Sequence, residues 1–405
     1  MPAVADSLNP PPKTPPRVPP KKRDWSWRSR AVRALAYQVL ALLLIGLALW
    51  FLAHNTLVNM RVRGIQSGFD FLTGPAGFDI GEKLVPYSPA DPYWHAFLIG
   101  VLNTLKVAVI GIVMTTILGT LLGIGRFSSN ALIRGLCYGY VELFRNVPIL
   151  LQLLMWYLML VQALPLPGQQ KSLFDLFFLS NGGITYPVPV WSLAWGLAAA
   201  GAVLGLVLAW VWARMARRHF EATGLPRPVL WPAFAMVIVG AASGWAIGGA
   251  PTDWNVPVPG GFSVDGGSAL TPEFIAVLLG LTLYTASFVA EVVRAGIASV
   301  PLGQSEAASA LGLSRGQQMR LVSLPQALRV IIPPLTNQYL NLTKNSSLAV
   351  AIGYPDIVSI SNTAINQTGR AVECISIIML VYLTTSLGTS ALMNWYNKRA
   401  AIKER

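Results

Sequence analysis

The chain has 405 residues, of which 54% are hydrophobic and only 12% are charged, and its mean hydropathy is +0.54. A soluble domain carries about a quarter charged residues, so this composition excludes an ordinary soluble protein and indicates an integral membrane protein. The net charge of +13 is also typical of nucleic-acid-binding proteins, but here the positions of the cations indicate membrane topology, and we expect no nucleic-acid partner.

The first part of the chain is a tail followed by a span. Residues 1–33 are basic and begin with a proline-rich stretch that lacks an apolar period, so we expect a disordered cytoplasmic tail. The next apolar segment has no small-residue cleavage site, which predicts a retained span and not a signal peptide. Residues 34–94 therefore hold a first span and an external segment rich in Gly, Pro and Asp. This segment is either a contact surface for an outside partner or a solvated loop.

The whole chain contains eight apolar segments long enough to cross a membrane, since a spanning helix needs about 20 residues. They lie near 35–53, 97–124, 138–163, 188–213, 229–250, 273–296, 327–351 and 374–396. These segments predict an all-α integral membrane fold. Its parts are a core at 95–163, an inserted two-span region at 164–272, a second core part at 273–397 and a tail at 398–405. In the insertion, Gly201-x-x-x-Gly205 and Gly240-x-x-x-Gly244 fit close helix contact.

Charge placement predicts the orientation of these spans. With eight spans, the arginines and lysines of both tails, of the segment after the fourth span and of the loop after the sixth all fall on one side. The opposite loops contain few cations and hold the acids Asp70, Asp79, Glu82, Asp91, Asp175, Asp253 and Asp265. This is the positive-inside pattern, so we expect both termini in the cytoplasm and contact between the basic segments and anionic lipid.

The sequence offers no catalytic or metal-binding constellation. Cys137 and Cys374 lie at opposite ends of different spans, which predicts neither a disulfide framework nor a metal cluster. The three histidines fall at span edges without ligand spacing, and no paired carboxylates share a face. The chain also lacks a Gly-x-x-x-x-Gly-Lys-Ser/Thr phosphate loop, so we expect no cofactor in this chain, and ATP would have to be hydrolysed elsewhere.

The most specific motif lies between the sixth and seventh spans. It reads Glu306-Ala-Ala-Ser-Ala-Leu-Gly312 and, nine residues later, Val322-Ser-Leu-Pro325. The small side chains of Ala307, Ala308 and Ala310 favour a short helix and allow another protein to approach closely.

The end of this short helix also has a sequence signature. Gly312 can adopt the left-handed conformation that ends a helix, and Ser314 with Gln317 has the spacing of a capping box. The loop is therefore expected to hold a short helix that ends at Gly312, with the next helix opening at Ser314.

This stretch resembles the EAA loop of ABC importer permeases, with Val322 where isoleucine is usual. Further segments resemble the polar amino-acid ABC permease family: Asn103–Leu105, Glu142–Pro148 with Leu150–Gln152, Ser287–Glu291 with Arg294–Ile297, Gly303–Ala308, Leu324–Arg329, Pro333–Leu335 and Lys344–Leu348. The resemblance covers 95–397 apart from the insertion. The extra first span, the insertion and the segments Pro75–Ile80 and Tyr87–Pro89 are similar to the general L-amino-acid branch, whereas Asn345-Ser346 stand where many members have Asp-Thr.

The resemblance implies a type I ABC importer transmembrane domain, with five core spans (the second, third, sixth, seventh and eighth) and three extra ones. It implies a bacterial inner-membrane permease subunit of an ATP-driven importer that forms the pathway for L-amino acids. The implied partners are a second permease subunit, two ATPase subunits that bind ATP and Mg, and a periplasmic amino-acid-binding protein. The extra spans favour a heterodimer of permeases.

The EAA loop is expected to couple this chain to the ATPase. A helix around 302–312 would dock into a groove on the ATPase, with Glu306 supplying a charge and Leu311 and Leu313 supplying apolar anchors. Movement of the ATPases would then move the sixth and seventh spans as rigid bodies. The predicted coupling residues are Glu306, Ala307, Ala308, Ala310, Leu311, Gly312 and Leu313.

Polar residues on two spans predict the substrate pathway, because polar side chains in the membrane usually face the bundle interior. In the sixth span they are Tyr284, Ser287, Glu291 and Arg294, and in the seventh Asn337, Asn341, Lys344 and Asn345. Just before the latter group, Pro333 and Pro334 predict a kink or break. Arg145 and Asn146, before Pro148, and Arg294 are predicted gate or interface residues.

Lys344 could attract the carboxylate of a zwitterion and Glu291 its ammonium, but each has a second interpretation. Glu291 and Arg294 can simply pair with each other, Lys344 can extend to the membrane interface, and the asparagines can bind neighbouring helices.

Two other function classes fit less well. An ion-coupled carrier that works alone would carry more intramembrane acids and repeat symmetry, and a membrane enzyme would need a catalytic constellation.

Overall fold

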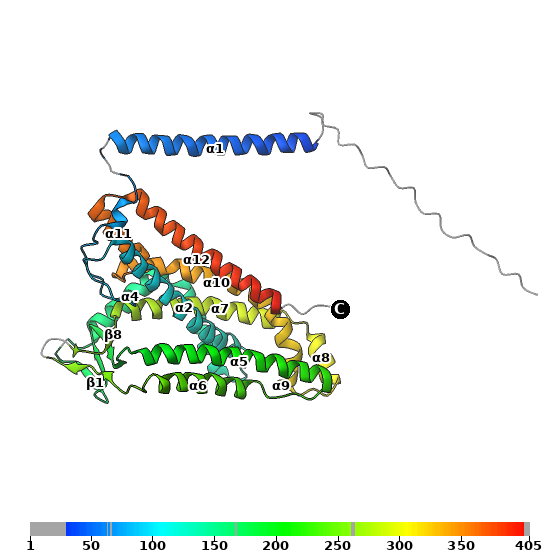
Figure 1. Cartoon of the computed structure of the whole chain (residues 1–405). Helices are drawn as coiled ribbons and strands as arrows, with labels where there is room; N and C mark the ends of the chain where they lie inside the picture. The colour runs from blue at the N-terminus through cyan, green and yellow to red at the C-terminus, as the bar shows by residue number, and fades with distance from the viewer. Residues whose placement is uncertain (1–29, 63, 65–66, 167, 261–263, 401–405) are drawn as a thin grey trace, which may run out of the picture. The chain divides into compact units, whose positions relative to one another are not determined.

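The computed structural model describes residues 30–62, 64, 67–166, 168–260 and 264–400, and the chain divides after Ser67 into two units, whose elements are labelled in Figure 1. Most of the predicted N-terminal tail and the last five residues lie outside the described residues.

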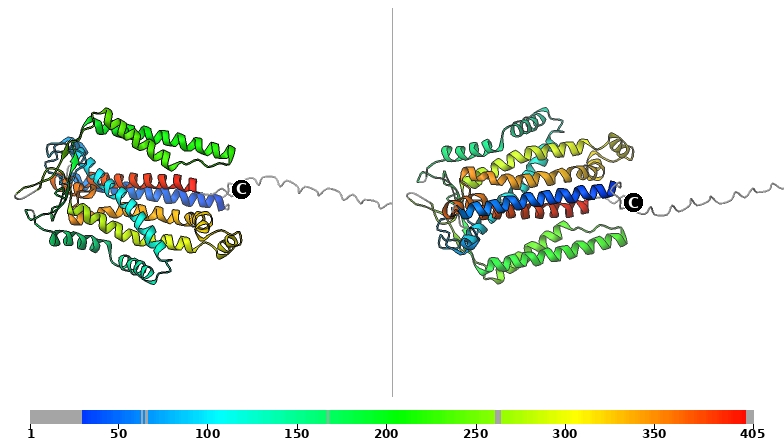
Figure 2. Two further views of the ribbon diagram at one scale, coloured as in Figure 1. Left: turned by 90° about the horizontal axis from the view of Figure 1, so that it is seen from below. Right: turned by 90° about the horizontal axis from the view of Figure 1, so that it is seen from above.

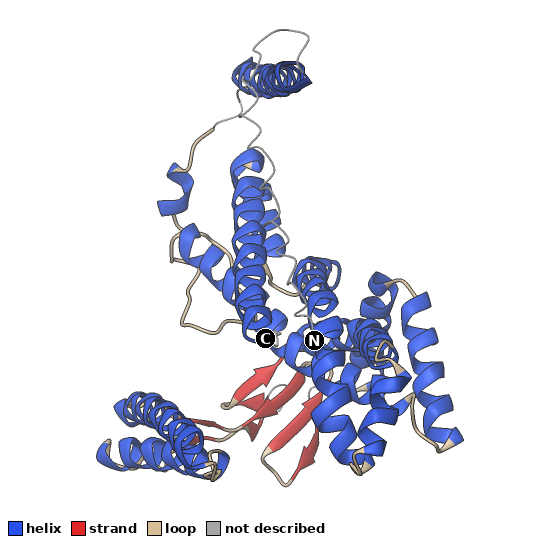
Figure 3. Cartoon of the chain, turned by 90° about the vertical axis from the view of Figure 1, so that its right-hand side faces the viewer, coloured by secondary structure: helices blue, strands red, loops and turns tan. Residues whose placement is uncertain are grey.

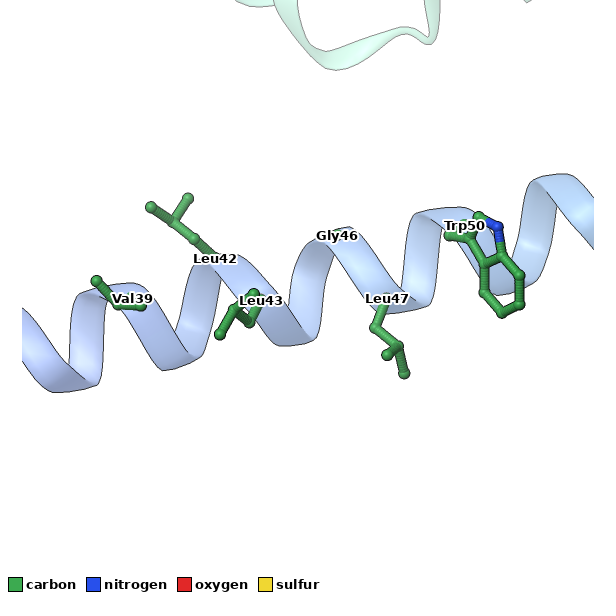
Figure 4. A pocket seen from close by; sticks show the side chains of 6 residues that line it. All are labelled: Val39, Leu42, Leu43, Gly46, Leu47 and Trp50. Atoms are coloured by element: carbon green, nitrogen blue, oxygen red, sulfur yellow. The ribbon is translucent and has the colours of Figure 1, made fainter.

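The first unit is the single helix α1 (Arg30–Val62). Its side chains are almost all exposed and apolar, as Figure 4 shows for Val39, Leu42, Leu47 and Trp50. A helix of 33 residues can cross the hydrocarbon layer, so α1 has the length and composition of the predicted retained span.

The second unit contains the other helices of membrane length. They are α2 (Tyr93–Gly125), α5 (Leu193–Thr223), α6 (Leu230–Ile247), α7 (Pro272–Ala298) and α12 (Ala371–Ala400). Two further spans are bent: α3 (Ala131–Asn146) meets α4 (Ile149–Ala163) at 105°, and the chain from Arg315 to Ile352 meets α11 (Ile357–Thr368) at 50°. Among the described residues, six helices can cross a membrane alone, or eight if each bent pair is one span, which agrees with the eight predicted segments.

Shorter elements connect these helices. They are η1 (Asp70–Thr73), α8 (Leu302–Ala310), α9 (Arg315–Gln318), the π-helical turn η2 (Met319–Ser323), α10 (Leu324–Asn345) and the 3₁₀ segment η3 (Ser346–Ile352).

The third predicted span is not one straight helix. Pro148 lacks an N–H and disfavours helical backbone at Val147, which is extended here with φ −97° and ψ 127°. The buried Gln152 side chain donates to the carbonyls of Phe144 at 3.0 Å and Val147 at 2.8 Å, and so pairs backbone groups that the turn exposes.

Replacing Gln152 with leucine should therefore destabilise the protein by about 1–3 kcal/mol, because two partly buried carbonyls lose their donor. A lower thermal unfolding midpoint in detergent would agree with this role. Leu151→Gln, on the exposed side of the same turn, is the control and should leave the midpoint unchanged.

Of the kink or break predicted at Pro333 and Pro334, the break is absent, since the helix runs on through both prolines. Both prolines lie inside α10, on its exposed face, and the helix continues to Asn345. The irregular backbone comes later, in η3 and in the turn at Gly353, whose φ is +80°.

The helix α7 lies at the centre of the second unit and contacts α2, α3, α4 and α10. Its closest neighbour is α2, where glycines allow the backbones to approach. A Cβ on Gly119 would lie 2.6 Å from Cβ of Val289, and a Cβ on Gly123 would lie 2.8 Å from Cβ of Val293. These two helices therefore pack as closely as their backbones allow.

The inserted helices α5 and α6 lie side by side along their length in both views of Figure 2. A Cβ on Gly201 would lie 2.0 Å from the carbonyl oxygen of Gly240, and one on Gly244 would lie 2.1 Å from that of Leu197. The close contact predicted from the glycine spacing is confirmed.

The loops beside these helices form short strands that the sequence analysis did not predict (Figure 3). One antiparallel sheet has the order β1 (Lys171–Leu173), β2 (Phe177–Ser180), β3 (Gly183–Tyr186) and β8 (Ser268–Leu270). Two strand pairs accompany it: β4 (Val188–Pro189) with β5 (Trp254–Asn255), and β6 (Val258–Pro259) with β7 (Val264–Asp265). Because β3 pairs with β8, the two ends of the insertion meet in one sheet.

Residues 68–92, named here the external segment, are folded onto the helices. Ala76, Ile80 and Tyr87 are buried in a cluster with residues of α2 and α11. At its start, Asp70 pairs with Arg370 at 3.1 Å. The segment is thus a packed part of the subunit and not a freely solvated loop.

Candidate functional site

The EAA loop forms a helical hairpin, in which the short helix, its end at Gly312 and the capping box predicted from the sequence are all present. The first helix, α8, ends before Gly312, which has the left-handed φ of +75°. Ser314 and Gln317 then form the predicted capping box, in which Ser314 N–H donates to Oε1 of Gln317 at 2.9 Å and Gln317 N–H donates to Oγ of Ser314 at 3.4 Å. The hairpin, named here the coupling hairpin, comprises residues 302–318.

The predicted coupling residues divide into two groups by exposure. Glu306, Ala307, Ala310, Leu311 and Gly312 are exposed, whereas Ala308 is buried and Leu313 is half-buried inside the hairpin. Leu311 is 81% exposed and so is Leu302, which the sequence analysis did not include. These two leucines and the exposed carboxylate of Glu306 form a small surface with apolar and acidic side chains.

The coupling hairpin is connected to α10 through glutamine side chains. Gln318 Nε2 donates to Oγ of Ser309 and to the carbonyl of Leu313, both at 2.9 Å, which fixes α9 against α8. Gln326 of α10 donates to Gln304 of α8 at 3.3 Å. The π-helical turn η2 between them is of a type often found at functional sites.

At the C-terminal end of α7, Glu291 is shared by two arginines. Arg294 Nη2 and Arg126 Nη1 each donate to one of its carboxylate oxygens at 2.5 Å. The Arg126 guanidinium also lies 4.9 Å from the Tyr138 ring centroid, so it joins α3 to this pair. The structure thus contains the Glu291–Arg294 pair that the sequence left open, and adds Arg126.

The α10 helix has a polar exposed face and an apolar buried one. Asn337, Asn341 and Lys344 are exposed, and Asn345 is half-buried. On the opposite side, Leu342 has no exposed surface. Within the described part of the chain, the structure gives the three exposed side chains no hydrogen-bond partner.

The residues predicted on α7 lie differently. Ser287 is fully buried and donates to the carbonyl of Tyr284 at 2.6 Å, while the half-buried Tyr284 ring lies 5.0 Å from that of Phe288. The two predicted polar faces therefore do not form one open surface within this subunit. The sequence shows that Ser287 is polar, but it does not show that the Ser287 hydroxyl already donates to a backbone carbonyl of its own helix.

The predicted gate residues lie at the bend between α3 and α4. The Arg145 guanidinium is 5.4 Å from the Phe288 ring centroid, and Asn146 donates to Glu142 at 3.4 Å. Tyr140 adds a 2.8 Å hydrogen bond to the carbonyl of Leu283, so α3 is attached to α7 at several points.

Residues 222–402, which include the coupling hairpin and α10, match the family of binding-protein-dependent transport system inner membrane components. The chain is 46% identical to the general L-amino acid transport system permease protein AapQ of Rhizobium johnstonii, over 94% of this chain and 96% of that protein. It is also 46% identical to the putative amino-acid ABC transporter permease protein YhdX of Escherichia coli, over 95% and 98%. A crystal structure of an amino acid ABC transporter with histidines is similar at a TM-score of 0.45 and 20% identity, over 76% of this chain and 95% of that one. The chain is thus a multi-pass membrane protein with a type I importer fold, and it belongs to the family of inner-membrane permease components of binding-protein-dependent transport systems.

Proposed function

We propose that this chain is the permease subunit of an ATP-driven importer that carries L-amino acids into the cytoplasm. The observation that carries the proposal is that the coupling hairpin and α10 are directly connected along the chain. The coupling hairpin passes through η2 directly into α10, and α10 has an exposed polar face. Similarity to amino-acid permeases over nearly the whole chain supports the substrate class.

The polar face of α10 needs a wet or polar neighbour. A charge at the centre of a membrane costs roughly 2.5–3.5 kcal/mol on insertion scales, so lipid is a poor neighbour for Lys344. A second permease subunit on the other side of a water-filled pathway would satisfy Lys344, Asn337 and Asn341. In this proposal Lys344 attracts the substrate carboxylate, while Glu291 belongs to the ion cluster with its two arginines.

The coupling hairpin supports the other half of the proposal. Its exposed leucines and Glu306 would contact one of two ATPase subunits, which would hold ATP and Mg outside this chain. A periplasmic amino-acid-binding protein would deliver substrate on the opposite side. The complex would lie in the bacterial inner membrane with both termini of this chain in the cytoplasm, in keeping with its charge distribution.

Replacement of Lys344 by methionine should raise the KM for uptake of L-glutamate about tenfold, since one contact to a charged group is lost. The Vmax should change less than the KM. Lys171→Met removes an exposed cation in β1 and serves as the control. An unchanged KM in the Lys344 variant would argue for the interface role of this side chain instead.

Uptake of radiolabelled glutamate, histidine and leucine into proteoliposomes tests the function itself. The vesicles hold this chain with a partner permease and the ATPase, with and without binding protein and ATP. We expect uptake only when all components are present. Uptake by this chain alone, driven by an ion gradient, would replace the proposal with a secondary carrier.

A further inference from the structure

Glu82 is a buried acid in the external segment, outside the coupling hairpin and the polar face of α10. Its side chain is 6% exposed, and both carboxylate oxygens have partners on different helices. The ammonium of Lys106, on α2, donates a hydrogen bond to one oxygen. Thr271 Oγ1, at the start of α7, donates a hydrogen bond to the other at 2.5 Å. A buried carboxylate with two such donors holds its neighbours in place, because removing either donor leaves a poorly compensated charge.

The two donors are also joined to each other through the first turn of α7. Thr271 is the N-cap of α7, and its hydroxyl oxygen accepts from Phe274 N–H at 3.1 Å. The Lys106 ammonium lies 4.1 Å from the Phe274 ring centroid, a cation–π distance. Glu82 therefore fixes the beginning of α7 to α2 through both backbone and side-chain contacts.

A fourth element, the turn before α11, joins through Asn103, one turn before Lys106 on α2. The Asn103 amide donates to the carbonyl of Glu82 at 2.8 Å and to that of Pro355, just before α11, at 2.9 Å. We name Glu82, Lys106, Thr271 and Asn103 the external clasp. It connects the external segment, α2, α7 and the turn before α11 at one point.

The position of the external clasp on α7 suggests its role. With 27 residues, α7 is about 40 Å long. The clasp holds its first turn, whereas its last turns carry Glu291 and Arg294 and lead directly into α8 of the coupling hairpin. A helix that is held at its first turn and displaced at its last turn rotates about the first turn.

We propose that the external clasp is the pivot of α7, with Glu82 as a positioning residue that converts displacement of the coupling hairpin into rotation of the helix. This inference rests on the proposed function. Without Glu82, α7 would also shift as a whole when the coupling hairpin moves. Less of the ATP-driven movement would then reach the substrate pathway.

The first test needs only the purified full chain in nanodiscs and measures amide hydrogen exchange. In Glu82→Gln, the first turn of α7 should exchange about tenfold faster, the change expected for losing one charge-assisted hydrogen bond. Asp79→Asn is the matched control. Asp79 pairs only within the external segment, with Lys83 at 3.3 Å, and the Ile80 N–H together with Lys83 lowers the pKa of its carboxyl. Equal exchange in both variants and wild type would show that no clasp exists.

The second test measures ATP hydrolysed per amino acid imported by the assembled importer, normalised to assembled complex. Glu82→Gln and Lys106→Met should each raise this ratio about fivefold, and the double variant should be no worse than either, because the two residues share one contact. Lys106→Arg keeps the charge and should stay near wild type.

The outcomes of the second test separate the two ideas. A purely stabilising clasp lowers the amount of complex but leaves the ratio unchanged, which would overturn the pivot. A wild-type complex that imports nothing would overturn the proposed function, while the exchange measurement still decides whether the clasp holds α7.

Discussion

Replacing Gly312 with valine is expected to lower ATP-driven uptake by about tenfold or more, while the ATPase still binds the permease. Gly312 has a φ of +75°, and no atom lies within 4 Å of the position of an added Cβ. The effect therefore comes from the backbone alone. A β-branched residue in this conformation costs about 1–2 kcal/mol, and a backbone that avoids the strain changes the angle between α8 and α9.

The matched control for Gly312→Val is Gly316→Ala. Gly316 also has no atom within 4 Å, but it lies in α9 and has no left-handed φ, so alanine should be tolerated. Uptake assays are combined with co-purification of the ATPase. Wild-type uptake by Gly312→Val would show that the turn geometry does not matter for coupling.

The second large effect is expected where α2 and α7 touch. Gly119→Ala should destabilise the protein by roughly 1–3 kcal/mol, because the new Cβ would lie 2.6 Å from Cβ of Val289 and 2.9 Å from the carbonyl oxygen of Ala286. These helices cannot separate locally without losing their other contacts. The thermal unfolding midpoint in detergent should fall.

The same substitution at Gly139 is the comparison. Gly139 lies on the exposed side of α3 with nothing within 4 Å, so alanine should leave stability unchanged or raise it by up to about 1 kcal/mol. Equal midpoints for the two variants would mean that the contact between α2 and α7 relaxes freely.

Features that depend on local chain chemistry could be predicted from the sequence. The coupling hairpin is the clearest case, because a left-handed glycine and a capping box act within a few residues. The close pairing of α5 with α6 follows from glycine spacing in the same way. In each case the physical cause lies in the same short stretch that shows the pattern.

Features that depend on distant partners could not be predicted. Hydropathy alone did not distinguish a straight span from the 105° bend at Pro148, because both are equally apolar. The periodicity of α7 suggested that Ser287 faces a pathway, yet a carbonyl three residues earlier satisfies it. Glu82 and Lys106 are 24 residues apart, and nothing in their local sequence indicates that they pair.

The pairing of β3 with β8 has a consequence for how this permease could be rebuilt. The strand β3 ends at Tyr186 and β8 begins beside it at Ser268, since these two residues are register partners. Among the described residues between them, α5 and α6 pack mainly against each other, and the two ends of this stretch lie side by side at the β3–β8 pair. The inserted hairpin can therefore be exchanged as one unit. Replacing it with a tight turn, or with a foreign domain whose ends are adjacent, should leave the spacing of the core helices unaltered.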